Sequence, residues 1–280
     1  MCAKLAYLGP PGTFSEEAAI RFAGGKSISL VPCAGIDTAI AAVEQKKADL
    51  GIVPVENSLE GSVNLTLDLL RHSSAQIRAE ILLPVRHCLL AQKGETLSGI
   101  KEVRSHPQAL AQCRHSLAEL LPGIPVRETV STAEAACLAA QHPGLGVVAS
   151  RHAAARYGLN VLREDLQDEK GNVTRFLILA AEDAPPTGDD KTSLLLGLPD
   201  RPGSLHDLLG VVANHGLNLT KIESRPIRGD LGKYIFFLDI QGHRRDKNVA
   251  LAISEMRNRT LFLKILGSYP RASFEDSSQK

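Results

Sequence analysis

Three patterns are missing from this sequence of 280 residues, and each absence excludes a class of protein. No apolar run approaches the roughly 18 residues of a membrane-spanning helix, and the N-terminus lacks the extended apolar stretch of a secretion signal. No block of about five or six like charges occurs and the formal net charge is +1, so nothing favours nucleic acid or a membrane surface as a partner. We therefore expect a cytoplasmic protein whose target is a small molecule.

Paired cysteines are the third missing pattern. The five cysteines (Cys2, Cys33, Cys88, Cys113 and Cys137) are scattered, without a C-x-x-C motif or a histidine at metal-ligand spacing. Such usage is typical of a reduced compartment and predicts no metal site. What the chain does have is 44% hydrophobic residues, enough over 280 residues for the cores of about two domains.

The first part of the chain alternates expected strands (residues 3–9, 48–55, 102–105 and 146–149) with expected helices. Capping-box patterns at 13–16 and 131–134, and Pro107 at a first helical position, mark three helix starts. Such alternation predicts parallel sheets, whose ligands bind where strand ends meet helix N-termini. The candidate residues at these ends are Thr13, Ser15, Asn57, Ser58, Ser105, Ser131 and Thr132. Each alone is typical of a helix cap, but several helix N-termini at one crevice favour an anion site.

The order of these elements predicts a two-lobed α/β domain over residues 1–181, with lobe one at about 1–78 plus 171–181 and lobe two at about 79–170. A cleft between the lobes, closing about the two crossings, is expected. Residues 182–190 are rich in proline and acids and are interpreted as a linker. Residues 191–269 have the βαββαβ order of a ferredoxin-like unit, and residues 270–280 are expected to be a disordered tail.

Thr174 and Arg175 interrupt an apolar run that extends from Val173 to Ala181. A hydroxyl donor beside a guanidinium, at the exposed end of a strand, suits a site that binds a carboxylate and donates a hydrogen bond to an adjacent oxygen. An edge strand with a solvated arginine would explain the same pair. Glu56 is an alternative proton source or a helix-start carboxylate, and His106 is interpreted as a structural residue at a helix start.

Seven short motifs, in this order and spacing, resemble the prephenate dehydratases that carry a C-terminal ACT regulatory domain. They are G-P-P-G-T-F-S (9–15), P-V-E-N-S-L-E-G-S-V (54–63), S-H-P-Q-A-L-A-Q-C (105–113), S-T-A-E-A-A (131–136), Y-G-L (157–159), N-V-T-R-F (172–176) and I-E-S-R-P (222–226). The resemblance spans nearly the whole chain, from Gly9 to about Tyr269. It implies a catalytic domain that is bilobal, like periplasmic binding proteins, followed by the ACT domain.

The resemblance also implies an activity: the conversion of prephenate to phenylpyruvate, water and carbon dioxide in L-phenylalanine biosynthesis, without a metal or an organic cofactor. Thr174 matches the catalytic threonine of the family. The substrate-binding residues that the resemblance implies are Thr13, Ser15, Asn57, Ser58, Gly61, Ser105, Gln108, Ser131, Thr132, Arg175 and Phe176. Arogenate dehydration and a non-catalytic anion sensor stay open as alternatives.

In the small domain the resemblance implies a site for L-phenylalanine as an allosteric inhibitor. The residues implied are Gly203, Ser204, Leu205, Asn218, Glu223, Ser224, Arg225 and Pro226. Ser204 and His206 stand where the family usually has alanine and valine, and this departure bears on effector affinity. We expect a homo-oligomer, either a dimer or a dimer of dimers, with the effector between paired small domains; a small domain that serves only dimerisation is the alternative.

Overall fold

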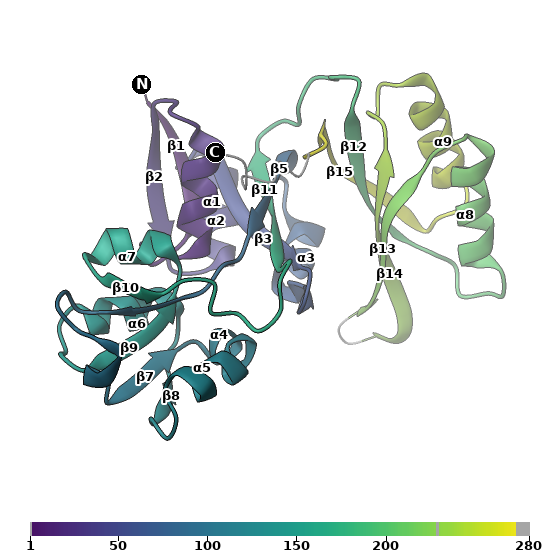
Figure 1. The fold of residues 1–280 in the computed structure, drawn as a ribbon. Coiled ribbons are helices and arrows are strands. Elements are labelled where there is room, and N and C mark those ends of the chain that lie inside the picture. The colour runs from purple at the N-terminus through teal and green to yellow at the C-terminus, as the bar shows by residue number, and fades with distance from the viewer. Residues whose placement is uncertain (1, 228–229, 273–280) are drawn as a thin grey trace. The chain divides into compact units, whose positions relative to one another are not determined.

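The computed structural model describes residues 2–227 and 230–272, and its elements are labelled in Figure 1. The chain divides into two compact units. Unit 1 consists of Met1–Thr66 and Ile81–Phe176, and unit 2 consists of Leu67–Glu80 and Leu177–Lys280. Each unit is described by itself below.

The first sheet has the strand order β2-β1-β3-β11-β5, and the short β4 pairs with β3. These strands are β1 (Ala3–Leu8), β2 (Ile28–Cys33), β3 (Leu50–Asn57), β4 (Gly61–Ser62), β5 (Gln76–Pro84) and β11 (Val173–Ala180). The helices that follow its early strands are α1 (Phe14–Ala23), α2 (Ile36–Glu44) and α3 (Asn64–His72). β1 pairs in parallel with both β2 and β3, as the alternation of strands and helices predicts.

The second sheet, with the order β10-β6-β9-β7-β8, lies entirely in unit 1. Its strands are β6 (Cys88–Ala91), β7 (Glu102–Ser105), β8 (Val126–Glu128), β9 (Leu145–Ala149) and β10 (Asn160–Arg163). The helical segments between them are η1 (Leu97–Gly99), α4 (Pro107–Gln112), α5 (Arg114–Leu120), α6 (Thr132–Ala139) and α7 (Arg151–Tyr157). β7 pairs in parallel with β8 and β9, whereas β6 runs antiparallel to β9 and β10.

The sequence predicts one helix from Pro107 to Leu121, but the structure divides it at Cys113, whose φ of −118° is not helical. The side chain of Asp168 accepts hydrogen bonds from the backbone N–H groups of His115 and Ser116, both at 2.9 Å. A carboxylate that accepts from the first N–H groups of a helix stabilises a helix start. Asp168 is more than 50 residues away in the sequence, so no local pattern could predict this break.

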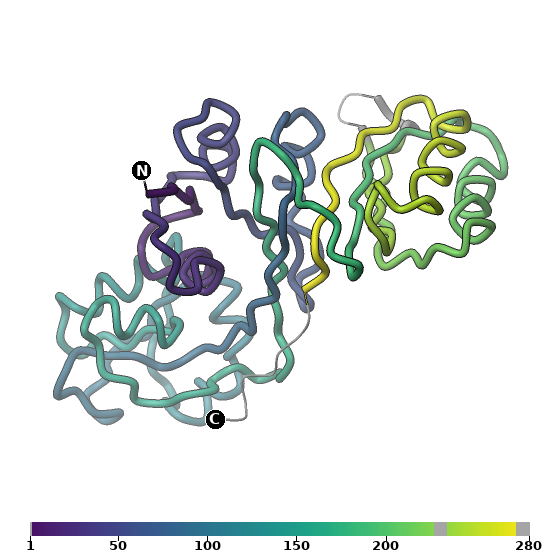
Figure 2. The backbone as a smooth tube through the Cα atoms, turned by 90° about the horizontal axis from the view of Figure 1, so that it is seen from above, coloured from purple at the N-terminus to yellow at the C-terminus, as the bar shows by residue number. Residues whose placement is uncertain are grey.

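The small domain in unit 2 has the expected βαββαβ order. Its elements are β12 (Asp190–Gly197), α8 (Ser204–Asn214), β13 (Leu219–Ile227), β14 (Asp230–Gln241), α9 (Lys247–Arg257) and β15 (Phe262–Pro270). The antiparallel sheet has the order β13-β14-β12-β15, and Figures 1 and 2 show α8 and α9 side by side on one face of it. Leu194, Leu238, Leu208 and Ile253 belong to the apolar core that sheet and helices form together.

The segment interpreted as a linker is fixed by its own acids. Asp183 is buried and accepts from the Ser268 N–H at 3.0 Å and from Arg244 at 2.9 Å. Asp190 is buried and accepts from the N–H and hydroxyl of Thr187 and from the Gly188 N–H. A pattern of acids and prolines does not distinguish solvated carboxylates from carboxylates that fix a turn.

The ends of the small domain also extend beyond the expected strands. The sequence predicts a first strand from Thr192, but β12 already begins at Asp190. β15 continues to Pro270 because residues 267–270 pair with residues 190–193. The sequence also predicts a turn at 229–232, but β14 already begins at Asp230. Residues 228–229 and the expected tail beyond residue 272 lie outside the described residues. No helix in the described part of the chain has both the length and the apolar character that a membrane span requires.

Candidate active site

A cleft of about 460 Å³ lies in unit 1. It is lined by the loop after β1, the first turn of α1, the ends of β3 and β5, the starts of α4 and α6, and the start of β11. Predicted site residues in its lining are Thr13, Ser15, Asn57, Gln108, Ser131, Thr132 and Thr174. The structure therefore brings together residues separated by as much as 161 positions (174 minus 13).

Amide side chains connect the catalytic candidate Thr174 to the opposite side of the cleft. Asn57 Nδ2 donates to Thr174 Oγ1 at 2.9 Å and to Asn172 Oδ1 at 2.7 Å. Asn172 Nδ2 in turn donates to Gln112 Oε1 at 2.9 Å. We call these four side chains the amide chain. It connects β3, β11 with the residue before it, and α4.

The direction of every hydrogen bond in the amide chain is determined at Asn57. Its Oδ1 accepts from the backbone N–H groups of Leu59 at 3.0 Å and Glu60 at 3.1 Å, so its other terminal atom must be the nitrogen. Thr174 Oγ1 therefore accepts from Asn57. Because a hydroxyl has one hydrogen to donate, that of Thr174 is available for an oxygen atom in the cleft.

His87 is a cleft residue that the sequence analysis did not select. It is 3% exposed, and its Nε2 lies 3.1 Å from Gln112 Oε1, an acceptor, so Nε2 carries the hydrogen. Burial lowers the pKa of His87, which keeps the ring neutral, and Phe14 packs against it edge-on at 5.6 Å between ring centroids. Gln112 and Asn172 were in recognised motifs and could have been selected, whereas His87 lies in a crossing segment outside all of them.

Two of the three helix starts that line the cleft, those of α1 and α6, are capped by hydroxyl side chains. Thr13 caps α1 by accepting from the Glu16 N–H at 3.3 Å, and Ser131 caps α6 by accepting from the Glu134 N–H at 3.0 Å. These caps leave the preceding N–H groups of each helix without a partner inside the helix. The hydroxyls act as caps, as each alone suggested, while the N–H groups beside them provide the partial positive charge that an anion needs.

Among the cleft-lining residues that the structure describes there is no lysine, arginine, aspartate or glutamate. Arg175 follows Thr174 in β11, and adjacent side chains of a strand point to opposite faces. Its Nη1 lies 3.7 Å from Glu56 Oε2, and neither residue lines the cleft. The role of Arg175 as a carboxylate ligand stays a prediction, as does that of Glu56 as a proton source.

Four other predicted residues lie outside the cleft lining. Ser58 joins the end of β3 to β11 by accepting from the Val173 N–H at 2.9 Å. Ser105 is fully buried and donates to the Val148 carbonyl, Phe176 is 1% exposed, and Gly61 has a φ of +81° in the turn between β3 and β4. They support the frame of the cleft, and their contact with substrate stays a prediction.

His106 has the structural position expected of it. Its Nδ1 accepts from the Gln108 N–H at 3.3 Å and so caps α4. The loop after β1 is held by Glu16, whose carboxylate accepts from the Gly12 N–H at 2.6 Å, from His152 at 2.8 Å and from Tyr7 at 3.1 Å. Gly12 has a φ of +92°, and a Cβ there would lie 2.7 Å from a ring carbon of Tyr157, so this position requires glycine.

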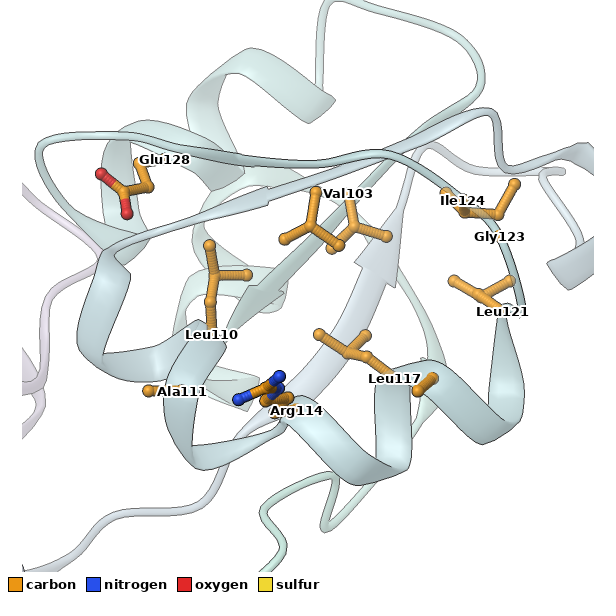
Figure 3. Close-up of a pocket in the computed structure, with 11 residues that line it drawn as sticks. Val103, Leu110, Ala111, Arg114, Leu117, Leu121, Gly123, Ile124 and Glu128 are labelled. Atoms are coloured by element: carbon orange, nitrogen blue, oxygen red, sulfur yellow. The ribbon is translucent and has the colours of Figure 1, made fainter.

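A second hollow of about 450 Å³ lies between β7, β8 and the helices α4 and α5. Figure 3 shows the apolar side chains of Val103, Leu110 and Leu117 around it, with Arg114 and Glu128 near its edge. It contains no residue that the sequence analysis predicted for a site. The cleft with the amide chain is therefore the candidate active site.

The predicted effector residues fall into two groups in unit 2. Ser204 and Leu205 line a pocket of about 250 Å³ together with Tyr234, Phe236 and Phe262, and Gly203 precedes α8 with a φ of +84°. Asn218 lies before β13, and Glu223, Ser224, Arg225 and Pro226 lie on β13; none of the five lines this pocket. Within one chain the two predicted motifs do not form a common pocket.

The fold and site define an α/β domain with a cleft whose described lining is uncharged and includes helix N-termini. A small domain of βαββαβ order follows it in the chain. The prephenate dehydratase family matches residues 5–184, and the ACT domain family matches residues 192–257. The chain belongs to the prephenate dehydratase family.

Proteins with two kinds of described activity are similar to this chain over nearly its whole length. A bifunctional chorismate mutase/prephenate dehydratase of Aquifex aeolicus is 45% identical over 98% of this chain and 75% of that protein. Arogenate dehydratase 2 of Petunia hybrida is 42% identical over 96% of this chain and 72% of that protein.

Two solved structures share the fold over the same extent. One is a prephenate dehydratase of Arthrobacter aurescens in complex with L-Phe, with a TM-score of 0.87 and 38% identity over 96% of this chain and 90% of that chain. The other is GqqA, described as a novel type of quorum-quenching acylase, with a TM-score of 0.88 and 33% identity over 97% of this chain and 99% of that chain.

Proposed function

We propose that this chain is a prephenate dehydratase that converts prephenate to phenylpyruvate, water and carbon dioxide in L-phenylalanine biosynthesis and is feedback-inhibited by L-phenylalanine. The observation that carries the proposal is the amide chain, which makes Thr174 an acceptor toward Asn57 and leaves its hydroxyl hydrogen for the cleft. Family membership supports the same activity.

The reaction requires that the protein bind the substrate and place one hydrogen-bond donor beside the departing oxygen. The bond from the ring to its carboxylate breaks and releases carbon dioxide, and the electron pair moves into the ring. The ring hydroxyl departs with the electrons of its own bond and takes up one proton, ultimately from solvent, to leave as water. Because an aromatic ring forms, the protein has only to hold the substrate and assist the departing oxygen. One preorganised donor such as the Thr174 hydroxyl contributes on the order of a few kcal/mol to the barrier reduction.

The cleft matches the charge of the substrate. Prephenate carries two carboxylates, and the N-terminal ends of two capped helices, α1 and α6, line the cleft, where the first N–H groups of a helix suit an anion. We infer that these N–H groups hold the carboxylates, and that Gln108 and the neutral His87 contribute to the polar wall. Phe14 supplies apolar surface beside the ring.

Arogenate, the amino analogue of prephenate, is the second candidate substrate, because one similar protein is an arogenate dehydratase. An acylase is not favoured by the geometry. No serine or threonine hydroxyl in the described cleft lining is hydrogen-bonded to either of its histidines, so the activated nucleophile of an acylase is missing from that lining.

We further propose a cytoplasmic homo-oligomer, a dimer or a dimer of dimers, in which paired small domains bind L-phenylalanine. In this proposal residues 1–181 are the catalytic domain, 182–190 connect the two, and 191–269 are the regulatory domain. The test is to incubate the purified protein separately with prephenate and with arogenate, and to follow the aromatic product of each. Turnover of neither substrate would contradict the proposed function.

A further inference from the structure

The strand β13 carries the predicted effector motif, and its alternation divides that motif between two faces. Ile222 is 43% exposed, and Ser224 and Pro226 are exposed on the same face. Glu223 and Arg225 are half-buried and lie on the other face. The side chains of the four motif residues therefore do not all lie on one face of the strand. We call the face with Ile222, Ser224 and Pro226 the outer face, and the other the inner face.

The inner face of β13 is bonded to α3. Arg225 Nη2 lies 3.1 Å from Asp68 Oδ1, with the two side chains 15% and 25% exposed. Along the same face Lys221 Nζ lies 3.2 Å from Glu223 Oε2. Partly buried ion pairs of this kind fix geometry more than they stabilise, because desolvation offsets much of their attraction.

Two other strands of the small domain bond the same segment of unit 2. Lys264 in β15 donates to the carbonyls of Leu70, Arg71 and Ser73, at the C-terminal end of α3. Lys191 in β12 pairs with the buried Glu80 in β5 at 2.9 Å. These contacts and the Arg225–Asp68 pair are called the polar layer.

The backbones of β15 and β5 also pack directly against each other. Gly267 has a φ of +153°, and a Cβ there would lie 2.2 Å from the Ile77 carbonyl oxygen. β15 therefore meets β5 backbone to backbone at this glycine, so a movement of the small-domain sheet must be accommodated by β5 and α3.

The first turn of α3 is bonded to the strand that carries Asn57. Thr66 Oγ1 donates to the Pro54 carbonyl in β3 at 2.6 Å, and β3 ends at Asn57, the residue that directs the amide chain. The nine-residue helix α3 therefore contacts β13 through Asp68, which pairs with Arg225. It contacts β3 two residues earlier, through Thr66.

From this geometry we propose that Arg225 is a coupling residue: its pairing with Asp68 transmits effector binding at the outer face of β13 through α3 to Asn57, and Arg225 itself does not contact the effector. The inference rests on the proposed feedback inhibition and assigns its route. Binding and inhibition should then separate when the pair is broken, because coupling is a free energy between sites and not part of either affinity alone.

The test measures two quantities on the full chain: L-phenylalanine binding by calorimetry, and the ratio of prephenate turnover without and with saturating L-phenylalanine. Arg225→Ala and Asp68→Asn should each bind L-phenylalanine within about threefold of the wild type, while the inhibition ratio falls at least about fivefold. The double exchange Arg225→Asp with Asp68→Arg should recover part of the ratio. Arg259→Ala is the matched control, because Arg259 pairs with Glu255 at 2.8 Å within α9 and the turn that follows it.

The outcomes separate the proposals. Loss of binding in parallel with inhibition would make Arg225 a ligand contact, and unchanged inhibition in both single variants would remove it from the route; either result overturns the coupling role alone. A wild type that turns over prephenate without inhibition contradicts the proposed feedback inhibition and the coupling role, and leaves the proposed dehydratase activity in place. A wild type that does not turn over prephenate contradicts the proposed function and the coupling with it. Asp68→Asn is nearly isosteric, so this variant tests the coupling role of the Arg225–Asp68 pair even if Arg225→Ala does not fold.

Discussion

The cleft of unit 1 and the polar layer of unit 2 both bury polar side chains, but they use opposite chemistry. The amide chain in the cleft is neutral, and each hydrogen bond in it has a fixed donor and acceptor. The polar layer consists of full charges on Lys191, Lys264 and Arg225 that meet carboxylates and carbonyls. A neutral chain ends in a free hydroxyl hydrogen that can assist chemistry, whereas the ion pairs are suited to holding two elements in one arrangement.

The largest expected effect comes from removing the hydroxyl at the end of the amide chain. Thr174→Ala should lower kcat by about two orders of magnitude or more with little change in KM, as for an interaction made mainly in the transition state. Thr174→Ser should recover much of the loss, because it keeps the donor. A kcat near that of the wild type in the alanine variant would remove Thr174 from the chemistry and favour Glu56.

The next effect tests the direction of the amide chain. Asn172→Asp is nearly isosteric but places an oxygen where Nδ2 donates to Gln112 Oε1 at 2.9 Å. Repulsion between two acceptors should lower kcat by about tenfold, in keeping with the cost of one unsatisfied buried polar group. The control is Asn214→Asp at the exposed end of α8, which should change kcat little. Equal kcat values for both variants would show that the direction of this chain is unimportant.

Most strands and helices of the fold, and some of the residues that line the candidate site, could be predicted from the sequence. The alternation of strands and helices and the βαββαβ order were predicted correctly because both depend on local periodicity and helix caps such as Thr13 and Ser131. The division of a helix at Cys113 and the antiparallel strands β6 and β10 were missed, since both depend on partners distant in sequence.

The same limit applied to single side chains. Thr174 and Arg175 were predicted for one site because they are adjacent. Neighbouring side chains of a strand alternate between its faces, and of the two only Thr174 lines the described cleft, so the role of Arg175 stays a prediction. His87 was missed because its neighbours Gln112 and Phe14 come from other segments. In unit 2 the motif from Glu223 to Pro226 was predicted for one ligand. The exposure of its side chains alternates, with Ser224 exposed and Arg225 half-buried, and its contact with an effector stays a prediction.

A smaller effect, on stability, should follow from the carboxylate of Asp190. Burial alone would raise its pKa, but hydrogen bonds from the Thr187 hydroxyl and from the N–H groups of Thr187 and Gly188 lower it below the usual value. A carboxyl whose pKa is lower in the folded state stabilises above the pKa of the unfolded chain, and this contribution is lost as the pH falls through the folded value.

Asp190→Asn should therefore lower the free energy of unfolding by about 1–3 kcal/mol at neutral pH. The difference between variant and wild type should shrink as the pH is lowered below about 4, the ordinary pKa of an aspartate. Urea unfolding at several pH values measures it. A difference that does not depend on pH would show that lost packing, and not the charge of Asp190, is responsible.

The smallest effect is expected on KM when Arg175 is substituted. This substitution tests whether a charged side chain outside the uncharged cleft lining contributes to substrate binding. If Arg175 bound a substrate carboxylate, as its position in the sequence suggested, then Arg175→Lys would raise KM. Because its side chain is directed to Glu56 and does not line the cleft, we expect KM to change less than about threefold. A larger increase, measured beside unchanged thermal unfolding, would place Arg175 in contact with the substrate after all.

The uncharged lining of the cleft has a consequence for the rate at which substrate arrives. Lysine or arginine side chains around a site attract an anion over roughly a Debye length, about 8–10 Å at physiological salt, and added salt removes that attraction. The described lining contains neither residue type, and helix N-termini act only within about one turn. A dianion should therefore be captured at close range instead of being steered from solution, so that kcat/KM changes little with ionic strength.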